Sequence, residues 1–304
     1  MPVLARRSFL AAVGVACLPE QAARATGNRP HLGIVVDMHS ASLVEPAMAR
    51  VREFGLSYCQ PHVGEMPSLE LAEPMRAAAR KYQVEMTAAS TLGPGKVDWD
   101  FYGGPGTCGL VPRATRSERI RALKLASDLA HACGIGAIHT HCGYLPEDPN
   151  SDLYKEGVQA IHGVATHAKS NGQIFLMETG QETPVTLLRA IVDTGLDNVK
   201  VNLDVANLIL YGKGEPVGAL DVIGPYVRGL HAKDGLYPTG PRELGKEVPV
   251  GQGRVNFPEV VRKLKQLNYT GPITIEREIN GPQQAIDIRA SKVFLEKLID
   301  QVYT

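Results

Sequence analysis

The sequence has few cysteines, few aromatic residues and no excess of charge of either sign. Its five cysteines form no C-x-x-C pair, and a chain of 304 residues does not need disulfide staples, so Cys59 and Cys142 are expected to be buried thiols in apolar runs. The 32 basic residues balance the 32 acidic ones, which argues against a nucleic acid or an anionic membrane as partner. A hydrophobic content of 44% indicates an ordered globular protein.

The first 25 residues have the pattern of an export signal. Arg6 and Arg7 precede an apolar run at 9–18, and the small residues at 23–25 suit a cleavage site. The run is too short to cross a membrane, which needs roughly 20 residues. We therefore expect a twin-arginine signal (1–25), a linker (26–30), a periplasmic location and no membrane insertion after cleavage. An amphipathic helix and lipidation of Cys17 are the alternatives.

From residue 31 onward, short apolar runs alternate with amphipathic stretches. This alternation predicts an α/β fold. A unit repeated eight times in a region of this length favours a (β/α)8 TIM barrel, predicted as a single domain over 31–304. A doubly wound open sheet is the alternative, but no glycine-rich phosphate loop follows the first run. The eight predicted strands lie at 31–37, 56–63, 84–90, 136–143, 174–180, 199–207, 227–235 and 273–279.

Two long segments interrupt the regular spacing, at 92–115 and 236–256. Both follow predicted strands, so in a barrel both lie over the carboxyl ends of the strands, where loops commonly form a substrate pocket. The first contains Trp99, Phe101 and Tyr102. Because exposed aromatic side chains are costly in a flexible segment, we expect a packed loop.

The last four predicted strands each carry an ionisable residue near the carboxyl end: Glu178, Asp204, His231 and Glu276. The carboxyl ends of neighbouring barrel strands converge, so these side chains are expected to share one centre. Three carboxylates and an imidazole suit a divalent ion, with Mn²⁺ favoured and Mg²⁺, Co²⁺ or Zn²⁺ as alternatives. Pairing of each residue with a rim arginine or lysine is the non-metal alternative.

The chain resembles the xylose isomerase-like barrel family of sugar phosphate isomerases and epimerases. The resemblance rests on the motifs LMETG, NLDVAN, LHAKDG, VGQGRVNF and YTGPITIEREI. It implies the same four metal ligands, with Glu178 and Glu276 as the acid–base pair. The chain departs from the epimerases at Asn207, where they often have histidine, and at Tyr237, near the place of an arginine. These departures leave the substrate open.

Further polar residues near strand ends are secondary candidates. His141 is expected to bind a sugar hydroxyl or transfer a proton, whereas His139 is expected to be buried on the other side of its strand. Glu278 is expected near solvent or behind the metal ligands, and Arg277 in the helix layer. Lys233 is expected to pair with Asp234 or Glu276. The predicted substrate-binding residues are His62, Glu182, Asn207, Lys233 and Arg242.

These residues predict a metal-dependent sugar isomerase or epimerase that removes a proton beside a carbonyl group and passes through an enediolate. The alternative reaction is β-elimination from a 3-keto-glycoside or an inosose, with His141 as the acid. Phosphodiester cleavage, as in the endonuclease IV branch, is disfavoured by the neutral charge. A carbohydrate-binding barrel is the non-enzymatic alternative. The expected partner is a small carbohydrate, and the assembly is left open between a homodimer and a homotetramer.

Overall fold

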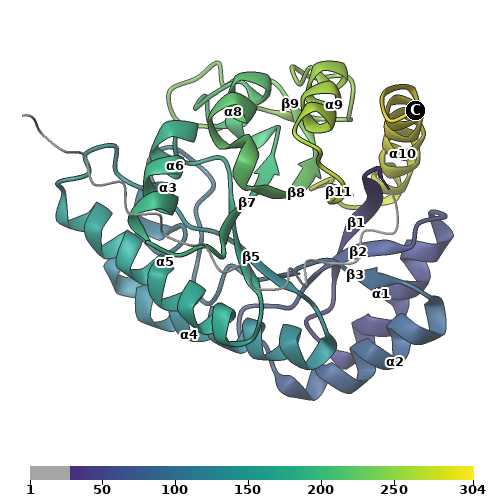
Figure 1. The fold of residues 1–304 in the computed structure, drawn as a ribbon, viewed down its shortest axis with the longest axis horizontal. Helices are drawn as coiled ribbons and strands as arrows, with labels where there is room; N and C mark the ends of the chain where they lie inside the picture. The colour runs from purple at the N-terminus through teal and green to yellow at the C-terminus, as the bar shows by residue number, and fades with distance from the viewer. Residues whose placement is uncertain (1–27) are drawn as a thin grey trace, which may run out of the picture.

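The computed structural model describes residues 28–304, which form a closed barrel of parallel strands inside a ring of helices (Figure 1). Neighbouring strands pair in the order β1-β2-β4-β5-β6-β7-β8-β11, and β11 pairs with β1 to close the barrel. The predicted TIM barrel is confirmed. The predicted export signal lies outside the described residues. Among the described residues, no helix is long and apolar enough to cross a bilayer.

The strands lie close to the predicted apolar runs, with differences at their ends. The barrel strands are β1 (His31–Asp37), β2 (Tyr58–His62), β3 (Glu85–Met86), β4 (Ala89–Ser90), β5 (Ala137–His141), β6 (Ile174–Glu178), β7 (Val199–Asp204), β8 (Val227–Ala232) and β11 (Pro272–Ile275). The third predicted strand is divided into β3 and β4, which both pair with β2. Past β8, β9 (Asp234–Gly235) pairs with β10 (Glu247–Val248) in an antiparallel hairpin within the second long loop.

The helices cover the outer faces of the strands. They are α1 (Ala41–Glu53), α2 (Ala72–Tyr82), α3 (Gly104–Thr107), α4 (Arg113–Cys133), α5 (Asp152–Ser170), α6 (Pro184–Asp193), α7 (Asn207–Leu210), α8 (Pro216–Ile223), α9 (Phe257–Gln266) and α10 (Pro282–Val302), with short 3-10 turns at Leu69–Leu71 and Gly224–Tyr226. Side-chain oxygens of Ser151, Thr183 and Asn256 cap α5, α6 and α9 by accepting backbone N–H groups. Most of the buried apolar side chains form one cluster between helices and strands.

The first long loop is packed, as expected, but the reason given for that expectation is wrong, because Trp99 and Tyr102 are 45% and 63% exposed. A buried arginine holds the loop instead. Arg119 on α4 is fully buried, and its guanidinium donates to the carbonyl oxygens of Thr107 (2.6 Å), Gly109 (2.9 Å) and Pro94 (3.2 Å). Gly109 lies so close to the end of β5 that a Cβ there would come within 2.2 Å of the Cys142 carbonyl carbon. The loop is therefore held rigidly over the carboxyl ends of the strands.

The second long loop is held by one carboxylate. Asp234 accepts backbone N–H groups from Gly251 and Gly253 at 2.9 Å and from Val255 at 3.1 Å, besides that of Gly235. Of the two partners expected for Lys233, Asp234 is therefore excluded, because the loop backbone already occupies its carboxylate, and Glu276 is confirmed at 3.3 Å. The two loops also meet, since the Phe101 N–H donates to the Arg242 carbonyl at 3.0 Å.

Candidate metal centre

The four predicted ligands converge at the carboxyl ends of β6, β7 and β8 and just past β11. One ligand atom from each of Glu178, Asp204, His231 and Glu276 lies within 4.8 Å of the others. The first three side chains are buried, and that of Glu276 is 16% exposed. Four strands far apart in sequence thus deliver one compact set of oxygen and nitrogen donors.

Asp204 divides its two oxygens between the backbone and the centre. Its Oδ1 accepts the N–H groups of Ala206 (2.8 Å) and Asn207 (2.7 Å), where the chain turns into the short helix α7. Its Oδ2 is buried and has no hydrogen-bond partner. A buried carboxylate oxygen without a partner is costly, so the fold leaves this atom available for a cation.

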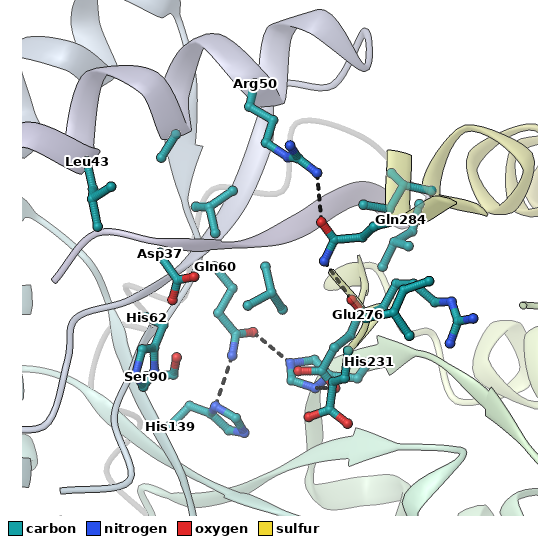
Figure 2. Close-up of a pocket in the computed structure, with 18 of the residues that line it drawn as sticks. Asp37, Leu43, Arg50, Gln60, His62, Ser90, His139, His231, Glu276 and Gln284 are labelled. Carbon is teal, nitrogen blue, oxygen red and sulfur yellow. Dashed lines mark hydrogen bonds and ion pairs between the residues drawn. The ribbon is translucent and has the colours of Figure 1, made fainter. Parts of the chain in front are cut away.

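His231 is oriented in the same way through a chain of hydrogen bonds from Gln60 on β2. The Gln60 amide nitrogen can only donate, and it lies 2.9 Å from Nδ1 of His139. Its amide oxygen can only accept, and it lies 3.1 Å from Nε2 of His231. His231 therefore carries its hydrogen on Nε2 when neutral. The lone pair of its buried, unpartnered Nδ1 faces the carboxylates (Figure 2).

The charges around Nδ1 of His231 call for a cation. Nδ1 lies 3.2 Å from Oε1 of Glu178, 3.2 Å from Oε2 of Glu276 and 3.7 Å from Oδ2 of Asp204. Burial alone would lower the pKa of His231, but Glu276 and Glu178 raise it well above its ordinary value. Nδ1 of His231 can bind either a proton or a metal ion, and the two compete for its lone pair.

Lys233 offsets part of the negative charge. Its ammonium group is buried, lies 3.3 Å from Glu276 and 4.0 Å from Asp204, and contacts Glu278. Burial opposes ionisation of Glu276, but Lys233 and His231 hold its pKa below its ordinary value. The three carboxylates of the centre and the Lys233 ammonium together carry two negative charges, without counting the exposed Glu278, and a divalent ion would offset these two charges. The donor set and its charge therefore fit Mn²⁺, Mg²⁺, Co²⁺ or Zn²⁺.

His139 and His141 on β5 both face Glu178, so the expectation for His139 was wrong. Their Nε2 atoms lie 2.7 Å and 3.1 Å from Oε2 of Glu178. Residues two apart on a strand point to the same side, and strand alternation therefore places both rings inside the barrel. Gln181 holds Nδ1 of His141 at 2.9 Å, and Trp99 meets this ring edge-on at 5.3 Å.

The other candidates are divided between the centre and its surroundings. Asn207 donates to Oε1 of Glu178 at 3.2 Å, and His62 lines the cavity, where burial lowers its pKa. Glu182 is buried behind the centre with Oε2 unpartnered, and burial raises its pKa to about 8. Arg242 lies on the surface over the ring of Tyr102, outside the cavity lining.

Arg277 and Glu278 lie as expected past β11. Arg277 reaches into the helix layer, where its Nε donates to Asp287 on α10 at 2.8 Å. The Glu278 side chain is 59% exposed and contacts Lys233 behind the centre. Sequence reasoning missed Gln60, although a polar residue two positions before His62 in an apolar run was a usable signal.

A cavity of about 1040 Å³ opens onto the centre. Its inner wall carries Glu178, His231 and Glu276 from the centre and Trp99 from the first long loop. The first half of the barrel contributes the rest of this wall, which comprises Asp37, Gln60, His62, Ser90, His139 and His141. The centre is thus buried in protein on one side and accessible to a small molecule on the other.

Comparison with known proteins places the fold in a family. The family described as xylose isomerase-like TIM barrel matches residues 48–298. The crystal structure of a xylose isomerase domain protein from Planctomyces limnophilus superposes with a TM-score of 0.82 at 31% identity, covering 90% of this chain and 99% of that one.

Two relatives are similar in sequence. A D-psicose 3-epimerase of Agrobacterium fabrum is 27% identical over 228 residues, 71% of this chain and 71% of its own. An uncharacterised protein of Methanocaldococcus jannaschii is 26% identical over 181 residues, 54% of this chain, and the match spans 60% of the relative's length. Because the family match covers most of the sequence, the chain belongs to the xylose isomerase-like TIM barrel family.

Proposed function

We propose that the protein is a divalent-metal-dependent epimerase or isomerase of a keto-sugar. The observation that carries the proposal is the position of Nδ1 of His231, 3.2 Å from a carboxylate oxygen of Glu178 and 3.2 Å from one of Glu276. Two candidate bases thus flank the position that a cation takes. Similarity to a D-psicose 3-epimerase supports a sugar as substrate.

The proposed chemistry divides between the ion and the carboxylates. A bound divalent ion would supply Lewis acidity to adjacent carbonyl and hydroxyl oxygens of the sugar. Glu178 takes the proton from the neighbouring carbon and holds it on a carboxylate oxygen, and Glu276 returns a proton from the other side. The two residues come from strands three places apart in the barrel, β6 and β11, which suits approach to opposite faces of one carbon. Epimerisation therefore starts with Glu178 ionised and Glu276 protonated and ends with the two states exchanged, and proton exchange with solvent restores the start. Lys233, 3.3 Å from Glu276, stabilises the Glu276 carboxylate that this proton transfer leaves.

The proposal is tested by incubating the protein with Mn²⁺ and a panel of ketoses in D₂O. We expect deuterium to enter at the carbon beside the carbonyl, and chelation to stop the uptake. A carbohydrate-binding barrel would instead keep its affinity for sugars in chelator and exchange no deuterium. Stoichiometric absence of metal with full exchange would refute the metal dependence.

β-Elimination is the second candidate reaction, and the position of His141 favours it. Its Nε2 lies 3.1 Å from the proposed base Glu178, and its ring lines the cavity beside Trp99. An acid next to the base could protonate a leaving oxygen one carbon further along the sugar. With 3-keto-glycosides as substrates, release of the aglycone distinguishes elimination from epimerisation, in which the glycosidic bond stays intact.

We also propose that the protein is exported through the twin-arginine route, on the pattern of residues 1–25. Lysine in place of both Arg6 and Arg7 should retain the protein in the cytoplasm, measured by cell fractionation. Normal export of the doubly substituted chain would show that the signal has been misread.

A further inference from the structure

The cavity does not end at the barrel interior, because two adjacent strands separate beside the centre. The paired register of β1 and β11 stops at Ile34 and Ile275. β1 continues along β2 as far as Asp37, while the chain after Ile275 leaves the sheet through residues 276–281. The cavity extends between these two segments, because Val36 and Asp37 line it from β1 and Glu276, Arg277 and Ile279 line it from the other chain segment.

The opening leads into a space between the first and last helices. One face of α1 carries Leu43, Ala47 and Arg50, and all three line the same cavity as the metal centre. α10 contributes Gln284 and Ile288. In Figure 2, the strand of Asp37 runs between Leu43 and Arg50 on one side and Gln60, His139 and His231 on the other. We name this part of the cavity the side chamber; it is lined by Val36, Leu43, Pro46, Ala47, Arg50, Ile275, Gln284 and Ile288.

The polar groups around the side chamber are largely occupied by protein partners. Arg50 donates to Gln284 at 2.8 Å, and Gln284 donates to the Arg277 carbonyl at 2.8 Å (Figure 2). Glu53 pairs with Arg289 at 2.6 Å. The remaining residues that define the side chamber are aliphatic, and the polar side chains of Glu278 and Asn280 line the neighbouring part of the cavity. The chamber itself therefore offers contact mainly to an apolar group.

The size of the cavity exceeds the need of a single sugar ring. Pockets of about 300–1,000 Å³ take drug-sized molecules, and this cavity measures about 1040 Å³. A ring at the metal centre fills only the inner part. The continuous space past Glu276 then accepts whatever is attached to that ring.

We propose that the substrate is a glycoside with an apolar aglycone, whose sugar lies at the metal centre and whose aglycone lies in the side chamber. This proposal rests on the proposed keto-sugar chemistry and specifies its substrate class. The aglycone contacts Leu43, Ala47 and Ile288, while the Arg50–Gln284 pair closes the outer end of the chamber. The sugar supplies the reacting carbon, and the aglycone adds binding energy without taking part in the proton transfer.

The test uses methyl, butyl and hexyl 3-keto-D-glucosides with the Mn²⁺-loaded protein. Trp99 is the only tryptophan of the chain and lines the cavity, so quenching of its fluorescence reports binding separately from turnover. We expect Kd to fall about fourfold for each methylene that the chamber buries. Deuterium exchange in D₂O gives kcat/KM for the same compounds, which should rise in parallel.

Two variants locate the effect. Ala47→Leu fills the chamber and Leu43→Ala removes part of its lining, and each should reduce the hexyl-to-methyl affinity ratio about tenfold. Val44→Ala is the matched control, because Val44 lies on the same helix but faces the core outside the cavity lining. It should lower thermal stability and leave the ratio unchanged, which separates loss of the chamber from poor folding.

The outcomes separate this proposal from the proposed function. If all three 3-keto-glucosides exchange deuterium but Kd does not depend on chain length, the proposal that the aglycone binds in the side chamber is refuted. The proposed keto-sugar chemistry would stand. Failure of all three to bind would overturn it as well. A steep dependence of Kd on chain length with no deuterium exchange would support the chamber and refute the proposed reaction.

Discussion

The two halves of the barrel differ in the number of charged side chains that they place at the cavity. The later strands, β6 to β11, end in Glu178, Asp204, His231 and Glu276, which are charged or become so on binding a proton. The earlier strands, β1 to β5, face the same cavity with one carboxylate, that of Asp37, and otherwise with amide, hydroxyl and imidazole groups: Gln60, Ser90, His62, His139 and His141. Gln60 joins the halves through its hydrogen bond to His231, and His139 and His141 join them through Glu178.

This difference shows a division of labour. The later half gathers negative charge that a bound cation would neutralise. The earlier half orients the side chains that would bind this cation, as Gln60 orients His231. Of the residues that line the cavity, the strands of the earlier half contribute one carboxylate, Asp37, so they add little repulsion to the three carboxylates of the centre. Substitutions in the later half should therefore remove the ion or the reaction, and substitutions in the earlier half should weaken both by smaller factors.

The largest expected effect is that of His231→Ala in the later half. The variant should lose stoichiometric metal and all measurable exchange activity, because the remaining three carboxylates repel one another. Wild-type Tm should rise on addition of Mn²⁺, since the ion binds the folded state, and the variant should not respond. His131→Ala, at an exposed position on α4, is the control. Full metal occupancy of the His231 variant would contradict the assigned centre.

The next largest effect is expected for the two proposed bases. Glu178→Gln and Glu276→Gln keep side-chain shape but remove basicity, which should lower deuterium exchange by about 10²–10⁴-fold. Glu278→Gln is the matched comparison, because Glu278 contacts the same Lys233 and is 59% exposed, and its loss should stay below about tenfold. If both Gln variants exchange at the wild-type rate with metal bound, His141 or Lys233 becomes the leading base.

A smaller effect is expected for Gln60→Leu in the earlier half. The change breaks the hydrogen bond that keeps Nδ1 of His231 free, so metal affinity should fall about 10–100-fold while the four ligands remain. Titration with Mn²⁺ by calorimetry measures the change, and Gln266→Leu on the exposed face of α9 is the control. Unchanged affinity would mean that His231 is oriented by its ring packing alone.

The smallest effect concerns stability rather than activity. Burial raises the pKa of Glu182 from 4.5 to about 8, so the folded state favours the neutral form. The contribution of Glu182 to the free energy of unfolding is therefore fully present below pH 4.5, and it is lost as the pH rises through about 8. Glu182→Gln should therefore raise Tm by about 5 °C at pH 9 and change it little at pH 4. Glu118→Gln, at an exposed position on α4, should change Tm equally at both pH values.

The four candidate ligands could be picked out from the sequence because each is an ionisable residue in an apolar surrounding. An ionisable residue at the end of an apolar run is costly unless it binds something, and Glu178, Asp204 and His231 lie at or one residue before the end of their strands. Glu276 follows β11 by one residue. The barrel followed from the same runs, since their number and spacing fit one closed sheet.

Gln60 and His139 show where local reasoning was insufficient. Both are neutral and could be buried on either side of a strand, so their role depended on which strands face each other across the barrel. Gln60 is 171 residues from His231, and only the closed sheet brings the two side chains within 3.1 Å. The direction of His139 was available from strand alternation, but its contact with Glu178 was not.

The sequence by itself determined the order of strands and helices, the ligand types and the charge of the centre, because these depend on periodicity and on residue chemistry along the chain. Only the tertiary structure decided which neutral groups orient those ligands and where the cavity extends. The side chamber arises because β11 ends at Ile275 while β1 runs on to Asp37. That mismatch is a relation between strands more than two hundred residues apart, and no local pattern encodes it.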